Sequence, residues 1–177
     1  MSSLWEVWLA TATRHATKPV VVDVTTGRTW TCAELTEAAE RLVVRGKIAP
    51  ISEPNNAQWF IRFLASQRVG AVALPLEPAL PATARHATVR RVASIRAKNI
   101  SCIKLTSGTT GDLTPIPCSA ANLIADGRQI CATMGIKPSD CNLALIPLGH
   151  SYGLGNLVMP GTFLSCIGSL NGPFFVR

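Results

Sequence analysis

Residues 105–111 read Leu-Thr-Ser-Gly-Thr-Thr-Gly and end the apolar run Ile100 to Leu105, which predicts a strand. A helical pattern begins shortly afterwards, near Ser119. Glycine adopts backbone angles closed to other residues, which lets a ligand approach the chain closely. Successive backbone N–H groups in such a turn can form an anion-binding nest. The stretch therefore predicts a mobile phosphate-binding loop between a strand and a helix, formed by Thr106, Ser107, Gly108, Thr109, Thr110 and Gly111.

Two common nucleotide-binding patterns are absent from this stretch. A Walker A loop has four residues between its glycines and then Lys-Ser or Lys-Thr. Here Gly108 and Gly111 are closer together, and no lysine follows Gly111. The Gly-x-Gly-x-x-Gly fingerprint of dinucleotide-binding folds is also missing. On composition alone, a surface turn rich in Ser, Thr and Gly is the alternative interpretation.

A second glycine-flanked segment contains a histidine, in the string Pro-Leu-Gly-His-Ser-Tyr-Gly-Leu at residues 147–154. It follows the apolar run Leu143 to Pro147, which predicts a buried strand. Ligands of α/β sheets bind beyond the carboxyl ends of the strands. We therefore expect His150 and the loop to share a pocket on one side of the sheet. A purely structural histidine, and core packing for Tyr152, are the alternatives.

The first half of the chain alternates between strand and helix patterns. The predicted helices cover residues 3–15, residues 31 to 46 after a Thr31–Glu34 capping box, and residues 56–70. The predicted strands are residues 20–24, with a hairpin return at Thr29-Trp30, and residues 71–76. Two prolines leave little room for a central strand in residues 47–56. This alternation favours parallel βαβ units.

Bulk composition limits the possible classes of protein. The 177 residues are 47% hydrophobic and 15% charged, which suits one globular core. The net charge of +7 is concentrated in a basic helical segment, residues 81–98, which lacks the interleaved aromatic residues of a nucleic-acid patch. We interpret this segment as a solvated helix face. The apolar C-terminal region is too interrupted by Gly and Pro to predict a membrane span. The six cysteines are scattered singly, which argues against structural zinc. Residues 1–6 lack the pattern of a secretory signal, so we expect reduced thiols in a cytoplasmic protein.

The string Thr-Ser-Gly-Thr-Thr-Gly resembles the phosphate loop of the adenylate-forming superfamily, which includes acyl-CoA synthetases and peptide-synthetase adenylation domains. The segment Pro147 to Gly153 resembles the second core motif of the family, Pro-Leu-x-His-x-x-Gly. Two further segments, the Glu-Leu helix near Leu35 and the Gly-Ala-Val strand ending in Pro-Leu-x-Pro, are similar to family scaffold segments. The resemblance covers most of residues 3–165.

This resemblance implies a ligase that converts a carboxylate and ATP into an acyl-adenylate and pyrophosphate. It implies ATP and Mg²⁺ as cofactors, with Thr106 as the hydroxyl nearest the metal. The carboxylic acid would be a fatty or aryl acid, and the acceptor would be the thiol of CoA or of a carrier protein. The acyl and nucleotide pocket would be lined by His150, Tyr152 and Gly153. Neither nucleic acid nor a membrane is an implied partner.

The sequence also departs from the family pattern. Thr114 stands where the family has a lysine that helps to hold the phosphates. The connections before Pro54 and after Pro78 are short, and the later family motifs do not occur in the 177 residues. We therefore expect an incomplete α/β N-terminal domain, with a mostly parallel sheet and flanking helices, which is inactive alone. Its divisions would be an opening scaffold at 1–80, a basic connecting segment at 81–99 and a phosphate-loop and histidine unit at 100–177. A degenerate, non-catalytic remnant with weak or no nucleotide binding is the alternative.

Overall fold

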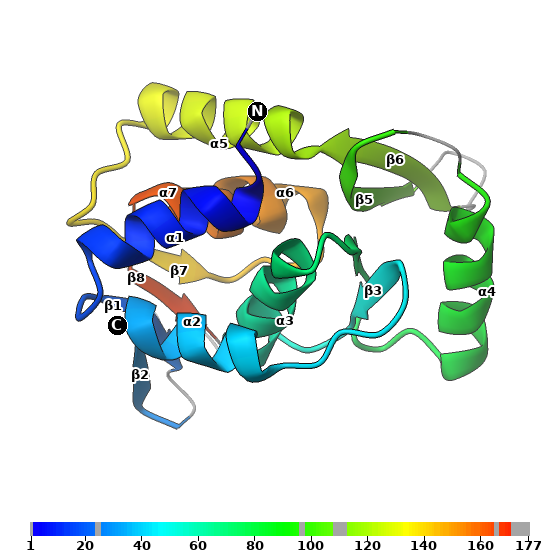
Figure 1. Cartoon of the computed structure of the whole chain (residues 1–177), viewed down its shortest axis with the longest axis horizontal. Helices are drawn as coiled ribbons and strands as arrows, with labels where there is room; N and C mark the ends of the chain where they lie inside the picture. Colours follow the sequence, from blue (N-terminus) through cyan, green and yellow to red (C-terminus); the bar gives the residue numbers. More distant parts are fainter. Residues whose placement is uncertain (1, 24–25, 96–97, 108–112, 165–166, 171–177) are drawn as a thin grey trace.

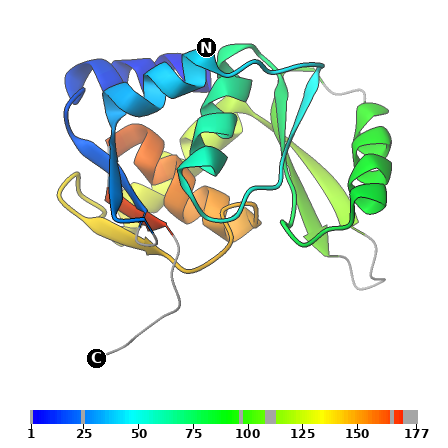
Figure 2. The same ribbon diagram turned by 90° about the horizontal axis from the view of Figure 1, so that it is seen from below.

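The computed structural model describes residues 2–23, 26–95, 98–107, 113–164 and 167–170. These residues form an α/β fold with two four-stranded sheets and helices packed between and around them (Figures 1 and 2). The strand order is β2-β1-β8-β7 in the first sheet and β3-β4-β5-β6 in the second. The expected α/β class and mostly parallel pairing are confirmed, but the strands are divided between two sheets where the sequence suggested one.

The first sheet joins the two ends of the chain. β1 (Pro19–Asp23) pairs antiparallel with β2 (Arg28–Thr31), as the hairpin pattern predicted. On its other side β1 pairs parallel with β8 (Ile167–Leu170), which in turn pairs parallel with β7 (Cys141–Ala144). Because β1 and β8 lie so far apart in sequence, this sheet depends on the whole chain being folded.

The second sheet carries the Thr-Ser-Gly segment. β3 (Ile48–Ile51), β4 (Val72–Pro75) and β5 (Ile100–Ser107) are parallel, and β6 (Leu113–Ser119) pairs antiparallel with β5. Two prolines were expected to leave little room for a central strand in residues 47–56, and the strand that forms there, β3, is an edge strand. β3 forms despite Pro50 because it lies at the edge of the sheet, where a missing N–H is tolerated.

Most helix boundaries follow the predicted caps. Ser3, Thr31, Asn56 and Ser119 each accept a hydrogen bond at the start of a helix. The helices are α1 (Leu4–Arg14), α2 (Cys32–Arg41), α3 (Ala57–Arg68), α4 (Ala82–Ala93), α5 (Ala120–Met134), α6 (Ser151–Gly153), a π-helical turn η1 (Leu154–Val158) and α7 (Met159–Leu164).

One helix end differs from the prediction. α2 ends at Arg41 and not at Gly46, because the backbone turns extended at Leu42. The guanidinium of Arg68 in α3 donates hydrogen bonds to the carbonyl oxygens of Ala39 and Leu42, at 3.2 and 3.1 Å. These bonds satisfy two carbonyl groups at the end of α2 that have no partner within the helix.

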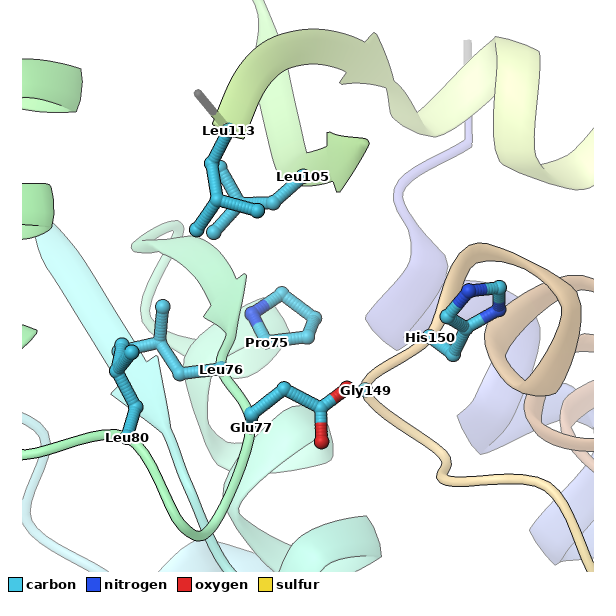
Figure 3. A pocket seen from close by; sticks show the side chains of 8 residues that line it. All are labelled: Pro75, Leu76, Glu77, Leu80, Leu105, Leu113, Gly149 and His150. Atoms are coloured by element: carbon cyan, nitrogen blue, oxygen red, sulfur yellow. The ribbon is translucent and has the colours of Figure 1, made fainter. Parts of the chain in front are cut away.

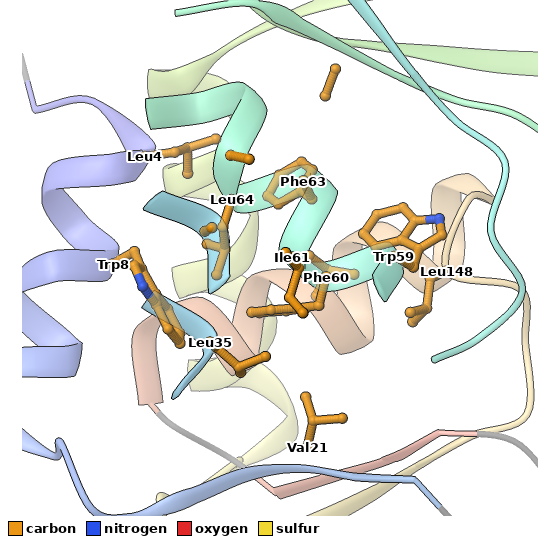
Figure 4. Close-up of a cluster of buried hydrophobic side chains, with 14 of the residues drawn as sticks. Leu4, Trp8, Val21, Leu35, Trp59, Phe60, Ile61, Phe63, Leu64 and Leu148 are labelled. Atoms are coloured by element: carbon orange, nitrogen blue, oxygen red, sulfur yellow. The ribbon is translucent and has the colours of Figure 1, made fainter. Parts of the chain in front are cut away.

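The main core surrounds α3, which contacts α1, α2 and strands of both sheets (Figure 4). The rings of Trp8 and Phe60 meet edge to face with 5.7 Å between centroids, and Trp59 stacks on Phe63 at 5.6 Å. A smaller cluster, Leu74, Leu76, Val92 and Ile103, fills the space between α4 and the second sheet. α3 thus links the two sheets, and the cavity described below lies where they approach one another.

The segment from Leu143 to Pro147 is not the buried strand that we predicted. β7 ends at Ala144, and the Leu143 and Leu145 side chains are 53% and 55% exposed. The physical reason is that β7 is the outermost strand of the first sheet among the described residues, so that it lacks a neighbour on one side. None of the helices in the described ranges has the length and apolar character needed to cross a bilayer.

Candidate functional site

The Thr-Ser-Gly segment lies at the turn of a β-hairpin. β5 and β6 pair over their whole lengths, and Thr106 is opposite Thr114 while Ser107 is opposite Leu113. The expected connection from strand directly to helix was therefore wrong, because β6 precedes α5. Thr106 and Ser107 end β5. The rest of the expected loop lies outside the described residues, namely Gly108, Thr109, Thr110 and Gly111, so its expected mobility stays a prediction.

The two faces of this hairpin have different surroundings. Leu105 and Leu113 line a cavity on one face. Thr106 and Thr114 lie on the other face, since side chains alternate along a strand, and the Thr106 hydroxyl is 3.4 Å from the Thr114 carbonyl oxygen to which it donates. On that second face Lys104 pairs with Asp126 of α5, with 3.6 Å between Nζ and Oδ2. Thr106 therefore stands beside an ion pair and does not line the cavity.

The cavity has a volume of about 260 Å³ and lies at the C-terminal ends of β4 and β5 (Figure 3). One wall is the segment that follows β7, so that both sheets contribute to it. Its ionisable side chains are Glu77 and His150, and the remaining lining is mainly apolar. The lining residues are Pro75, Leu76, Glu77, Leu80, Leu105, Leu113, Gly149 and His150.

His150 caps the first turn of α6. Its Nδ1 accepts a hydrogen bond from the Tyr152 backbone N–H at 3.4 Å, and its carbonyl accepts from Leu154 at 2.9 Å. With Nδ1 as an acceptor, the neutral imidazole has its proton on Nε2. The exposed imidazole at the cavity wall (Figure 3) can therefore offer an N–H donor to a ligand.

The other two residues of the histidine motif are placed differently. The Tyr152 side chain is 52% exposed, does not line the cavity and is not packed in the core. Gly153 is buried, and a Cβ atom there would lie 2.2 Å from the Pro147 carbonyl oxygen. The structure thus brings His150 to the cavity that Leu105 and Leu113 line at the turn end of the hairpin, while Gly153 permits close packing of α6 on the preceding loop.

Asn55 is a positioning residue that the sequence did not reveal. Its side-chain amide donates to the carbonyl oxygens of Ala144 and Ile146, at 3.1 and 2.8 Å. Its Oδ1 accepts from the Leu148 backbone N–H at 2.8 Å. Three hydrogen bonds from one side chain thus fix the segment that leads to His150. Nothing local in the sequence predicted these contacts, which lie about 90 residues away.

Glu77 was also missed as a site residue. It follows β4 directly and lines the cavity, and no ion pair or side-chain hydrogen bond involves its carboxylate among the described residues. An acid just beyond the C-terminal end of a parallel strand is the signal that could have identified it. Asp112, the acid nearest to the Thr-Ser-Gly segment in the sequence, lies outside the described residues.

The two cysteines of the β5–β6 hairpin are not suited to act as nucleophiles. Cys102 and Cys118 face one another across β5 and β6, and burial is the main cause that raises the pKa of each thiol. A thiol held neutral in this way is a poor nucleophile. Within the described ranges, no three side chains among His, Cys, Asp and Glu gather closely enough to form a metal centre. The described residues therefore indicate neither a cysteine nucleophile nor a metal centre at this site.

The sequence matches no family model, and no curated protein is significantly similar to it. Solved structures are similar in fold. ATP-bound MatB from Rhodopseudomonas palustris superposes with a TM-score of 0.75 at 18% identity over 98% of this chain. The Klebsiella oxytoca NpsA N-terminal subdomain, in complex with 3-hydroxyanthranilyl-AMSN, gives 0.76 at 15% identity over 100% of this chain.

VinN in complex with L-aspartate gives a TM-score of 0.75 at 17% identity over 96% of this chain. All three proteins are adenylate-forming enzymes. The chain has the adenylate-forming fold. It spans about half of the solved chains, namely 46% of MatB, 55% of NpsA and 57% of VinN. Because the sequence identities are this low, the substrates of these three proteins cannot be assigned to this chain.

Proposed function

We propose that this chain carries the ATP-phosphate site of an adenylate-forming ligase. In the reaction, a carboxylate oxygen attacks the α-phosphorus of ATP, a new P–O bond forms, and pyrophosphate leaves with the electrons of the broken bond. The observation that carries the proposal is that Thr106 and Ser107 end β5 directly after Leu105, which lines the His150 cavity together with Leu113 at the start of β6. The ATP-bound state of a protein with this fold supports it.

Each part of the site has a distinct role in this proposal. Backbone N–H groups and hydroxyls of residues 106–111 bind the phosphates, as expected of an anion-binding nest. The imidazole of His150 donates from Nε2 to an oxygen of the acyl-adenylate region, while Asn55 keeps the His150 segment in place. Leu76, Leu80, Leu105 and Leu113 exclude water and favour an acid with an apolar body. We therefore propose a fatty or aryl acid as the substrate class.

The residues present also suit a magnesium ion. Mg²⁺ prefers hard oxygen ligands, and Thr106 and Ser107 bring hydroxyl oxygens to the end of β5. We propose Thr106 as the ligand nearest the metal, whereas Glu77 lines the cavity on the opposite face of the hairpin and is not part of this ligand set. When bound with ATP, the ion would offset the phosphate charge. The thiol acceptor, of CoA or of a carrier protein in the cytoplasm, belongs to the same proposal.

We further propose that the 177 residues do not catalyse adenylation by themselves. Phosphoryl transfer relies on positioned cationic groups, yet neither lysine nor arginine lines the described cavity. Thr114, at the family's lysine position, brings a neutral hydroxyl to the hairpin. The loss of one charge-stabilising group typically costs about 10²- to 10³-fold in rate. ATP binding without turnover is therefore the activity that these residues support.

The test of this proposal has a binding arm and a catalytic arm. Equilibrium dialysis of the 177-residue chain should show weak binding of MgATP and none of adenosine, because the phosphates are the recognised part. Pyrophosphate exchange with a panel of carboxylic acids should stay at background. Acid-dependent exchange that Thr106→Ala abolishes would contradict the catalytic half. Equal binding of adenosine and ATP, or of neither, would overturn the phosphate site and favour the degenerate remnant.

A further inference from the structure

A second cavity lies on another part of the second sheet, between β3 and α4. Its volume is about 320 Å³, and it shares no lining residue with the His150 cavity. α4 presents one face to it, with residues at helical spacing, and α4 packs against β3 (Figure 1). The lining residues are Pro50, Ser52, Ala82, Arg85, His86 and Val89.

The polar side chains of this cavity are hydrogen-bond donors. Arg85 donates from Nη1 to the Ser52 hydroxyl oxygen at 2.8 Å. Because that oxygen accepts from Arg85, the Ser52 O–H is free to donate onward. The Arg85 Nε atom is shielded from solvent and has no hydrogen-bond partner in the described part of the chain. A buried N–H without an acceptor is costly, so the guanidinium has an incomplete set of partners.

The charges around this cavity are mostly of one sign. There is no Asp or Glu from Pro78 to Gly111, whereas Arg90 and Arg91 follow on α4. Glu53 directly follows the lining residue Ser52 in the sequence, and its carboxylate is paired with Arg62. α4 also starts without a side-chain cap and without an acid in its first turn. Unpaired N–H groups at a helix start favour a negative ligand, which adds to the side-chain donors.

We propose that this cavity binds an oxyanion of the phosphate class, held by the Arg85 guanidinium, the His86 imidazole and the Ser52 hydroxyl. A planar guanidinium offers paired N–H groups that match two oxygens of such an anion. The donors lie together in the lining, beside the apolar Pro50, Ala82 and Val89, which suits one phosphate group rather than a polyphosphate chain. The proposal does not depend on the function of the hairpin, because no residue is shared.

The experiment is a titration of the ¹⁵N-labelled chain with inorganic phosphate at constant ionic strength, followed by ¹H–¹⁵N spectra. The Arg85 Nε–H, the His86 ring and the amides of Ala82 to Ala84 should shift along one saturable curve. Arg85→Gln should weaken binding by about tenfold or more, since hydrogen bonds to charged groups are the strong ones. Arg85→Lys should also weaken it, because a lysine lacks the planar fork.

Arg90→Gln is the matched control, because it removes the same charge from the same helix outside the cavity. It should leave phosphate affinity within about twofold, as expected of a screened surface charge. Equal loss in Arg90→Gln and Arg85→Gln would overturn the proposal in favour of general attraction by a basic helix. The absence of saturable shifts in the wild type would overturn it outright. Neither result affects MgATP binding at the hairpin, which is measured separately with Thr106→Ala.

Discussion

Replacing Gly153 with alanine should lower the free energy of unfolding by about 3 kcal/mol, or prevent folding altogether. The backbone at Gly153 is already helical, with φ −61° and ψ −44°, so alanine meets no conformational penalty there. The obstacle is contact, because the new Cβ would lie 2.2 Å from the Pro147 carbonyl oxygen and 2.9 Å from its carbon. These are backbone atoms, which cannot turn aside. Urea denaturation followed by tryptophan fluorescence measures the change.

Gly155→Ala is the control for this substitution, two residues further along the same helical segment. A Cβ there would meet only the Ile130 Cδ1 and Asp126 Oδ2 atoms, at 3.5 and 3.6 Å. Because alanine is the better helix former, its stability should change by no more than about 1 kcal/mol. If both substitutions were equally harmless, the close packing of α6 on the Pro147 segment would be refuted.

Replacing Asn55 with alanine should cost about 3 kcal/mol, since each of its three hydrogen bonds is worth about 1 kcal/mol. The bonds join the start of α3 to the segment that leads to His150, across about 90 residues of sequence. Their loss should also disorder the cavity wall. We therefore expect weaker MgATP binding, beyond the loss of stability, when the variant is measured at a temperature where it remains folded.

Asn156→Ala removes a single amide from the same region and serves as the comparison. Its Nδ2 donates one exposed hydrogen bond, to the Tyr152 carbonyl oxygen at 3.0 Å. The expected change is within about 0.5 kcal/mol, as for surface substitutions in general. MgATP affinity in Asn55→Ala equal to that in Asn156→Ala would show that Asn55 does not position the site.

Local signals in the sequence predicted most of the helices. Ser3, Thr31 and Ser119 each cap a helix with the residue three positions later, and these patterns involve only neighbouring residues. The strand β6 was missed because Pro115 and Pro117 interrupt its pattern. β6 forms because it is the outer strand of its sheet among the described residues. Pro115 and Pro117 are two positions apart, so both positions that lack an N–H lie on the same side of the strand.

The division into two sheets could not be predicted from local patterns. It depends on β1 pairing with β8 and on β4 pairing with β5, which are contacts between distant segments. The same reason explains what was missed at the site. The loop and His150 stand in recognisable strings, whereas Glu77 and Asn55 become site residues only when the two sheets meet. The proposed binding roles of the residues in these two motifs, 106–111 and 147–153, remain predictions.

The most direct measurement of the central claim is a titration of the ¹⁵N-labelled Arg85→Gln chain with MgATP, followed residue by residue. We expect saturable shifts at the hairpin residues 105–114 and at His150, and none on titration with adenosine. Thr106→Val should weaken this binding by about tenfold, the worth of one hydrogen bond, while Thr133→Val on the far end of α5 should not. The absence of saturable shifts at the hairpin, or shifts only at α4, would contradict a phosphate site in this fold.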